Sequence, residues 1–308
     1  MRALLVVNPI ATSTTRRARK VLTGALASEL KVDSFTTEYR GHAVQLARQA
    51  AADGLDLVIA LGGDGTVNEV VNGVLAGGPG PGVPDVAVVP AGGTNVLART
   101  LGLPDDPVEA TGVVLEALRS GRRRTIGLGR ANERYFTFCA GLGLDAEVVR
   151  RVEEQRARGR RATPGRYLRS TVRRFFGGTD RRRPALTLER PGCPPRSGLF
   201  LGIVTNTATW TYLGARPVMP CPATTFDTGL GLFAMDRLSL PVTLRHASQL
   251  LSAGRRPPHG RHLVTLHDET AFTLRADRAV ALEIDGDYMG ECDQVRFRLV
   301  PAALRVIA

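Results

Sequence analysis

The chain has 308 residues, of which 43% are hydrophobic, and a formal net charge of +12. This length is too great for one ordinary domain and sufficient for two, each with its own core. The hydrophobic content, with 34 Gly and 19 Pro, is typical of a globular, loop-rich protein and excludes a membrane-spanning one. Four cysteines without a CxxC pair favour a reducing compartment and neither disulfides nor a metal framework.

The first residues predict a buried strand. The apolar run 3–7 is too short for a signal peptide and has no cleavage site after it. Up to residue 120, short apolar strands alternate with amphipathic helices, the pattern of a parallel α/β sheet. The predicted strands are 3–7, 57–61 and 86–89, and the predicted helices are 15–30, 42–52, 66–76, 95–101 and 107–120.

A glycine-rich turn, Gly62-Gly63-Asp64-Gly65-Thr66, follows the second predicted strand. Three glycines let the backbone turn tightly and expose its N–H groups at the start of the next helix, where they can bind an anion. A carboxylate beside a phosphate repels it unless a cation lies between them, so Asp64 predicts a Mg²⁺ ion. The pattern therefore predicts a site for nucleotide phosphates. A P-loop is excluded because no G-x4-G-K-[ST] pattern occurs.

After residue 121 the pattern changes to short runs of Val, Thr, Phe and Leu separated by turns, which predicts a mostly antiparallel second domain, a β-sandwich. The predicted strands are 135–139, 185–188, 199–205, 271–275, 280–284 and 295–300. We place the domains at 1–120 and 121–308, with the last residues able to return to the first domain.

Near the end of the second domain, Asp285-Gly286-Asp287 follows an apolar strand. A kinase needs a carboxylate to take the proton from the acceptor hydroxyl, and either aspartate could serve. From local sequence alone the tripeptide is more typical of a hairpin turn. Both interpretations stay open here.

Most of the positive charge lies between Arg150 and Arg183, where thirteen Arg stand against three acids, so that 13 − 3 gives +10. Such a patch favours an anionic surface, either nucleic acid or a membrane leaflet, although it is also typical of a solvated loop. Aromatic and aliphatic residues such as Tyr167 and Phe175 recur in it at roughly helical spacing, as an interfacial helix requires. Trp210 and Tyr212 are weaker candidates for a lipid-facing rim, with core packing as the default role of both.

Four motifs, in this order, resemble the diacylglycerol kinase catalytic-domain family, which includes sphingosine kinases and bacterial lipid kinases. They are Asn8-Pro9, the turn at 62–69, the second glycine turn at 90–95 and the tripeptide at 285–287. The likeness extends through essentially the whole chain. It implies a fold like that of NAD kinase and diacylglycerol kinase in the first domain, ATP and Mg²⁺ as cofactors, and a membrane lipid as acceptor.

The resemblance also implies which residues line the ATP site. They are Asn8, Pro9, Thr12, Thr37, Gly62, Gly63, Asp64, Gly65, Thr66, Asn68, Glu69, Gly92, Gly93, Thr94 and Asn95. Of the two aspartates in the later tripeptide, Asp287 stands where the family has Glu. A structural Mg²⁺ of bacterial members implies Asp227 as a second metal ligand, but Thr228 replaces the aspartate expected beside it.

These observations predict an ATP-dependent lipid kinase with diacylglycerol as the first acceptor to test. It would be cytoplasmic and peripheral at the inner membrane face, docked through the segment from Arg150 to Arg183. The alternatives are a sphingoid-type lipid kinase, an NAD kinase, which shares the GGDGT turn, and a non-catalytic module that binds membrane or nucleic acid. As a kinase the chain is expected to bind no nucleic acid; a homodimer is left open.

Overall fold

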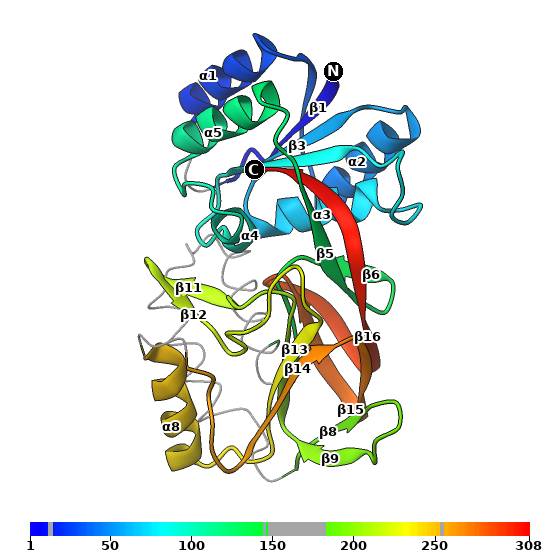
Figure 1. Ribbon diagram of the computed structural model, residues 1–308, viewed down its shortest axis with the longest axis vertical. Coiled ribbons are helices and arrows are strands. Elements are labelled where there is room, and N and C mark those ends of the chain that lie inside the picture. Colours follow the sequence, from blue (N-terminus) through cyan, green and yellow to red (C-terminus); the bar gives the residue numbers. More distant parts are fainter. Residues whose placement is uncertain (12–14, 144–145, 147–182, 253–255) are drawn as a thin grey trace. The chain divides into compact units, whose positions relative to one another are not determined.

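The structure is a computed structural model that describes residues 1–11, 15–143, 146, 183–252 and 256–308. The chain divides into two compact units, one of Met1–Leu128 with Pro301–Ala308 and the other of Gly129–Val300 (Figure 1). The division falls inside strand β5 (Arg124–Ala131), whereas the sequence placed the boundary at 120, where the preceding helix ends.

The first unit contains a parallel sheet. Its N-terminal strands are β1 (Arg2–Val7), β2 (Lys31–Thr36), β3 (Leu57–Gly62) and β4 (Asp85–Pro90). They lie in the order β4-β3-β1-β2 and pair in parallel. Val306 and Ile307, at the end of strand β16, add a further parallel strand beside β4. Strand β2 was not predicted because almost all of it is exposed at the sheet edge, so no apolar run marks it.

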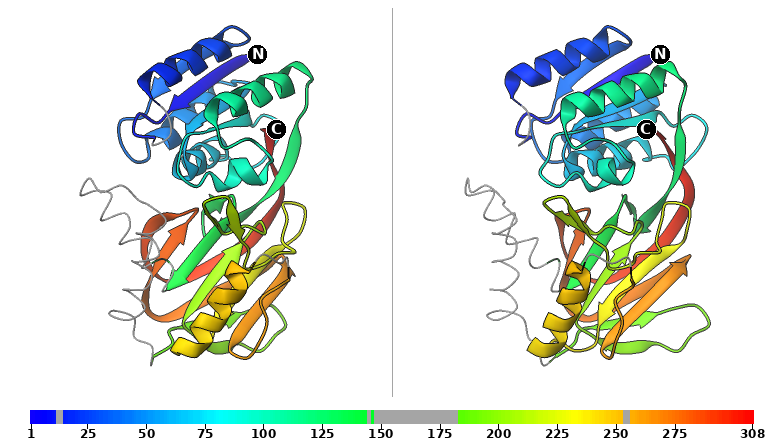
Figure 2. Two further views of the ribbon diagram at one scale, coloured as in Figure 1. Left: turned by 90° about the vertical axis from the view of Figure 1, so that its left-hand side faces the viewer. Right: turned by 60° about the vertical axis from the view of Figure 1, so that its left-hand side comes forward.

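Helices cover both faces of this sheet (Figure 2). They are α1 (Arg16–Ala27), α2 (His42–Ala52), α3 (Asp64–Val74), α4 (Val96–Thr100) and α5 (Pro107–Arg119). Helix α1 packs with α5, and α2 packs with α3. Right-handed crossovers place α1 on one face and α2 and α3 on the other, because the chain moves in opposite directions along the sheet. Strands β3 and β4 are consequently buried over their whole length.

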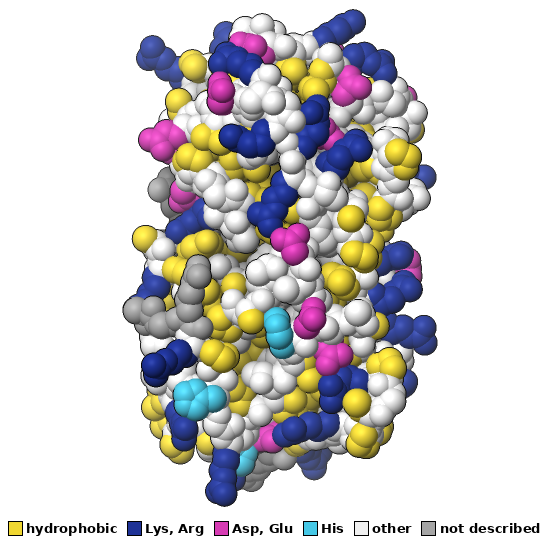
Figure 3. Space-filling model, viewed as in Figure 1, with side chains coloured by type: hydrophobic (Ala, Val, Ile, Leu, Met, Phe, Trp, Pro, Cys, Tyr) yellow, Lys and Arg dark blue, Asp and Glu magenta, His cyan; other side chains and the backbone are white. Residues whose placement is uncertain are grey.

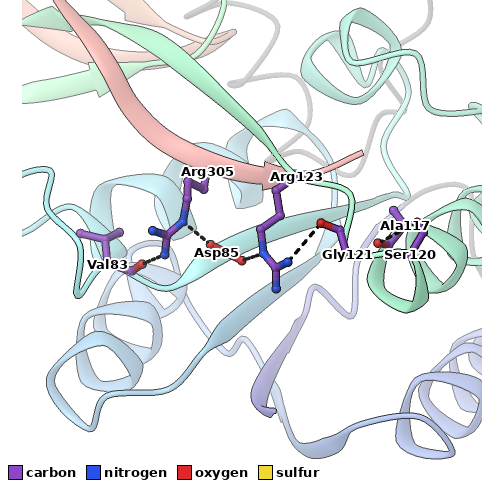
Figure 4. Close-up of polar contacts among 7 residues, drawn as sticks. All are labelled: Val83, Asp85, Ala117, Ser120, Gly121, Arg123 and Arg305. Carbon is purple, nitrogen blue, oxygen red and sulfur yellow. Dashed lines mark hydrogen bonds and ion pairs between the residues drawn. The ribbon is translucent and has the colours of Figure 1, made fainter.

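An acidic side chain at the start of β4 holds two other parts of the first unit (Figure 4). The Asp85 side chain is 6% exposed, and its two oxygens lie 2.6 Å from Arg123 Nε and 2.7 Å from Arg305 Nε. Arg305 also donates to the Val83 carbonyl at 3.2 Å. Arg123 immediately precedes β5 and Arg305 lies in β16, the two strands through which the chain passes between its units. One carboxylate therefore anchors both strands to β4.

We expect Asp85→Asn to lower the free energy of unfolding by about 2 kcal/mol. A buried carboxylate that loses its charge gives up two ion pairs, but both arginines are more than a third exposed, which reduces their contribution. Urea unfolding followed by circular dichroism measures the change. Asp277→Asn is the matched control, since Asp277 is 65% exposed and pairs only with its neighbour Arg278 among the described residues. Equal stabilities of the two variants would refute this role of Asp85.

The second unit consists mainly of antiparallel strands. They are β6 (Arg134–Phe136), β7 (Cys139–Gly143), β8 (Leu186–Glu189), β9 (Arg196–Leu199), β10 (Leu201–Thr205), β13 (Leu230–Met235), β14 (Leu263–Glu269), β15 (Ala271–Ile284) and most of β16 (Asp287–Ile307), with a small separate ribbon of β11 (Thr211–Leu213) and β12 (Arg216–Val218). The predicted fold class, a parallel α/β unit followed by an antiparallel one, is confirmed. The predicted runs 271–275 and 280–284 form one strand, β15, with an irregularity between Arg275 and Val280.

Strand β15 joins two groups of strands around one core. Its first part pairs with β8 and its last part with β7, and the exchange occurs at that irregularity. Core residues from both groups include Phe136, Leu142, Leu274 and Phe297. A strand that changes partners at a bend brings two layers together, which is why short strands suffice to bury this core.

A smaller apolar cluster lies beneath helix α8 (Leu240–Leu251). It contains Leu201, Phe233 and Leu238, and Trp210 packs against it. The default interpretation of Trp210, core packing, is therefore confirmed. Within the part of the chain that the structure describes, no helix is long and apolar enough to cross a membrane.

Candidate active site

The predicted ATP-binding residues of the first unit gather at one edge of its parallel sheet. Asn8 follows β1, Thr37 follows β2, Gly63 follows β3 and Gly92 stands just beyond β4. The strand registers align these ends, since Val7 lies beside both Thr36 and Leu61, and Gly62 beside Pro90. Ligands of open α/β sheets bind at this carboxyl edge. The sequence motifs thus converge where the fold provides a binding site.

Hydrogen bonds connect the ends of the strands. The Asn8 amide donates from Nδ2 to Thr66 Oγ1 at 2.9 Å, and its Oδ1 accepts from the Ile10 N–H at 3.0 Å. The Thr37 N–H donates to the Val7 carbonyl at 2.9 Å. Asn8 therefore joins the turn after β1 to the first turn of α3, which sets the position of the glycine turn.

The two glycine turns touch through their backbones. The Ala91 N–H donates to the Gly62 carbonyl at 2.8 Å. A Cβ on Gly92 would lie 2.7 Å from the Gly63 Cα, and a Cβ on Gly62 would lie 2.6 Å from Thr66. Such distances do not occur between real Cβ atoms and their neighbours, so these positions require glycine.

Helix α3 begins at this contact with no side chain capping its N-terminus. Its first residues, Asp64, Gly65 and Thr66, carry the N–H groups that lack a partner within the helix. Backbone N–H groups at a helix start attract phosphate oxygens. The Asp64 carboxylate accepts from the Leu97 N–H at 3.4 Å, which holds it between α3 and the start of α4. The geometry provides phosphate donors and one carboxylate side by side.

Three further predicted ATP-site residues also have internal partners. The Glu69 carboxylate accepts from the N–H groups of Gly41 at 2.8 Å and Ala43 at 3.2 Å, and so caps helix α2. Asn68 is 1% exposed and accepts from Asn72 Nδ2 through its side chain at 3.2 Å. Asn95 bonds both the N–H and the carbonyl of Gly92 and donates to Asp105 at 2.8 Å. These side chains shape the two turns that a nucleotide would contact.

The other predicted residues of this site differ in exposure. Pro9 and Gly93 are exposed and Thr94 is half-buried in the second glycine turn. Thr12 lies outside the described residues, as does almost all of the arginine-rich segment from Arg150 to Arg183. The expectations about them remain predictions.

In the second unit, Asp285 and Gly286 form the turn of a hairpin between β15 and β16. Ile284 pairs with Asp287, and φ is +49° at Asp285 and +82° at Gly286. Positive φ at both central residues is the conformation that favours Asp-Gly in two-residue hairpins. The hairpin interpretation is therefore confirmed. It leaves room for a chemical role, because the same hairpin carries both acidic candidates.

The Asp285 carboxylate is 2% exposed and accepts four hydrogen bonds. Its Oδ2 accepts from the N–H and the hydroxyl of Thr137 at 2.7 and 2.9 Å, and its Oδ1 from the N–H groups of Phe138 and Cys139 at 3.0 and 3.1 Å. Both oxygens already have two donors each. Asp285 is thus committed to holding the turn against residues 137–139.

A second buried carboxylate supports the same turn. Glu283 is 1% exposed, and it accepts from the Gly286 N–H at 2.8 Å and from the Cys139 thiol at 3.5 Å. Asp287, one residue beyond the turn, is half-buried instead. Of the two aspartates that the sequence singled out, Asp287 is the one that solvent reaches.

The predicted second metal ligand, Asp227, is exposed. The hydroxyl of Thr228, which stands in place of a second carboxylate, accepts from the Thr225 N–H at 2.9 Å. No cluster of three or more His, Cys, Asp or Glu suited to a metal ion occurs among the residues that the structure describes. With Thr228 in place of the second carboxylate, a structural Mg²⁺ at Asp227 stays a prediction.

A hollow of about 260 Å³ lies at the opposite end of β15 from the hairpin. Phe272, Thr273 and the arginines Arg190, Arg296 and Arg298 line it. It contains none of the residues that the sequence proposed for binding or catalysis.

Sequence reasoning missed the partners of the candidate residues. Thr137, which gives two of the four hydrogen bonds to Asp285, is 148 positions away in the chain. Asp105 and Glu283 were also not singled out. The sequence did contain a sign that Glu283 is unusual. It is an acidic residue within the apolar run 280–284, at the largely buried end of β15.

Residues 2–131 match the family model of the diacylglycerol kinase catalytic domain. A diacylglycerol kinase of Staphylococcus aureus (strain MRSA252) is 27% identical over 298 residues, which cover 94% of this chain and 87% of that protein. A diacylglycerol kinase of Bacillus subtilis (strain 168) is 39% identical over 120 residues, 39% of this chain and 37% of that protein.

The solved structure of a diacylglycerol kinase from Bacillus anthracis str. Sterne has the same fold, with a TM-score of 0.71 at 18% identity over 99% of this chain and 96% of that one. An NAD kinase from Archaeoglobus fulgidus, solved in complex with ATP, is more distant, with a TM-score of 0.52 at 9% identity over 100% of this chain and 94% of that one. The family match and these relatives agree: residues 2–131 match the diacylglycerol kinase catalytic domain, and the chain is a kinase similar to the lipid kinases of that family.

Proposed function

We propose that the protein transfers the γ-phosphoryl group of ATP to the hydroxyl of a membrane lipid, with diacylglycerol as the acceptor and phosphatidic acid as the product. The observation that carries the proposal is the junction of the two glycine turns, where α3 begins at Asp64 without a side-chain cap. The S. aureus relative named diacylglycerol kinase, which aligns with most of the chain, supports this acceptor.

In this proposal the first unit binds the nucleotide. The N–H groups at the start of α3 and of the residues after Gly92 in the second glycine turn donate to phosphate oxygens. Asp64 would hold a Mg²⁺ ion, since this ion needs only one or two protein carboxylates when it is bound with phosphates. When bound, the ion neutralises charge that develops on the phosphates. Asn8, Glu69 and Asn95 hold these turns in place through the hydrogen bonds described above.

The second unit supplies the base. The acceptor hydroxyl must lose its proton as its oxygen bonds to the γ-phosphorus and the bond from that phosphorus to ADP breaks. We assign the proton to Asp287, because a base needs an oxygen lone pair open to the hydroxyl. Each oxygen of Asp285 already accepts two hydrogen bonds. In this assignment Asp285 holds the turn that positions Asp287.

Docking at the inner face of the membrane through the segment from Arg150 to Arg183 belongs to the proposal as well. An anionic leaflet attracts arginines by about 1 kcal/mol each near the surface. A peripheral cytoplasmic location follows from the substrate, and neither nucleic acid binding nor a homodimer is needed for this chemistry.

A phosphorylation assay with labelled ATP tests the proposed function. The full chain is incubated with Mg²⁺ and, separately, diacylglycerol vesicles, sphingosine, NAD or no acceptor. We expect label to enter phosphatidic acid in the first case alone. Label in phosphorylated sphingosine or in NADP would replace diacylglycerol by that acceptor, and equal ATP consumption in every case would contradict lipid phosphorylation.

A further inference from the structure

Helix α8 has two apolar faces, and the residues that the structure describes cover one of them. Val242 and Leu250 pack against the cluster of Leu201, Phe233 and Leu238. On the same side His246 is 1% exposed, and its Nε2 lies 3.2 Å from the Arg261 carbonyl. This face attaches the helix to the second unit.

The other face presents leucines to solvent. Leu240, Leu244 and Leu251 are 42%, 59% and 41% exposed. At 100° per residue their directions fall within roughly 40° of one another, so they form one stripe along the helix. Large apolar residues aligned on a solvent-facing stripe cost free energy in water unless another surface covers them.

The segment of chain that contains α8 is basic. From Arg237 to His262 the sequence contains five Arg and no Asp or Glu. Arg237, Arg245, Arg256 and Arg261 are described, and all four are exposed. In the space-filling view, hydrophobic, Arg and His side chains are interspersed over α8 (Figure 3). A partner surface that covers these residues must have an apolar interior for the leucines and negative charge at its boundary for the arginines.

We propose that α8 is an interfacial helix that lies on an anionic lipid bilayer, with its three exposed leucines inserted between the lipids and the neighbouring arginines at the phosphates. Apolar and basic residues combined in this way are the requirement for a helix lying in the membrane plane. The inference rests on the proposed function, because a membrane lipid as the substrate brings the enzyme to a bilayer. It is independent of the arginine-rich segment between Arg150 and Arg183.

Vesicle co-sedimentation of the full chain, without ATP, tests the proposal. The vesicles are phosphatidylcholine alone or mixed with phosphatidylglycerol. We expect the triple variant Leu240→Gln, Leu244→Gln and Leu251→Gln to bind the mixed vesicles at least tenfold more weakly than the original chain. The control is Val21→Gln on α1, because Val21 is 61% exposed on a helix of the other unit and should not affect binding.

A charge variant provides a second measurement. Arg245→Gln with Arg261→Gln should weaken binding to the mixed vesicles and leave binding to phosphatidylcholine unchanged, and added salt should reduce the difference. If the leucine variant loses its circular dichroism signal, the charge variant decides. Unaltered binding of the mixed vesicles by a folded leucine variant would overturn the proposal. So would a dimer that this variant converts to monomers in light scattering, since a second copy would then cover the stripe.

Activity on a soluble short-chain diacylglycerol separates this inference from the proposed function. The leucine variant should phosphorylate that substrate at the rate of the original chain. Absence of lipid phosphorylation by the original chain would refute the proposed function, while the dependence of vesicle binding on α8 would still stand.

Discussion

Asp285→Asn is expected to lower the free energy of unfolding of the second unit by about 4 kcal/mol. Asp287→Asn should change that free energy by no more than about 0.5 kcal/mol, and it should lower turnover by roughly 10²- to 10⁴-fold. The asparagine NH₂ at position 285 would face two donors that now bond a carboxylate oxygen. Two charge-assisted hydrogen bonds are lost and buried donors remain without acceptors. At position 287 the change removes a general base from a half-buried site.

Thermal or urea unfolding and steady-state rates, measured on both variants, separate the two effects. Asp293→Asn is the control, since Asp293 is an exposed aspartate on the same strand, and it should change neither quantity. Native stability in Asp285→Asn together with lost turnover would make Asp285 the base and reverse our assignment. Near-native turnover in both variants would remove the base from this hairpin.

Asp64→Asn should reduce turnover by roughly 10²- to 10³-fold, the loss that follows removal of one strong electrostatic contact in a transition state. The asparagine oxygen can still accept from the Leu97 N–H, now 3.4 Å from the carboxylate, so the fold should be kept. The missing charge is what weakens the hold on Mg²⁺. Rates measured over a range of Mg²⁺ concentrations should show a higher requirement for the ion in the variant.

The control for Asp64 is Asp56→Asn. Asp56 precedes the same strand, β3, at its amino end, where its carboxylate accepts from the Arg2 N–H at 2.6 Å. Both changes remove one negative charge next to β3, and only one of them lies at the carboxyl edge. A similar loss of rate in the two variants would show a general effect of charge and would contradict a metal-binding role for Asp64.

The sequence predicted the first unit well because its signals are local. Helix α2 has the predicted bounds, β1 and β3 differ from the predicted strands by one residue at one end, and β4 by one residue at each end. Apolar runs mark strands buried on both faces. In the second unit such runs were ambiguous. The predicted strand 199–205 is divided at Phe200 into β9 and β10. The largely exposed edge strand β14 and the amphipathic helix α8 were not predicted.

For the candidate site too, the sequence could predict some features and not others. Gly62, Gly63 and Gly92 could be singled out from the sequence, because a turn that exposes its N–H groups needs glycine. Their contact with one another could not, since Gly63 and Gly92 are brought together by the parallel pairing of β3 with β4. The sequence also identified Asp285 and Asp287 as candidates for the base, but it could not choose between them.

By itself, then, the sequence determined that a strand ends in a glycine-rich turn, that two acids follow an apolar strand, and that one segment is rich in arginine. Each of these is a property of neighbouring residues. Tertiary structure alone decided that Asp285 is enclosed by four donors from residues 137–139, that Glu69 caps another helix, and that the leucines of α8 face solvent. Those outcomes depend on which distant segments pack together, and hydrogen-bond partners across more than a hundred residues leave no pattern in the local sequence.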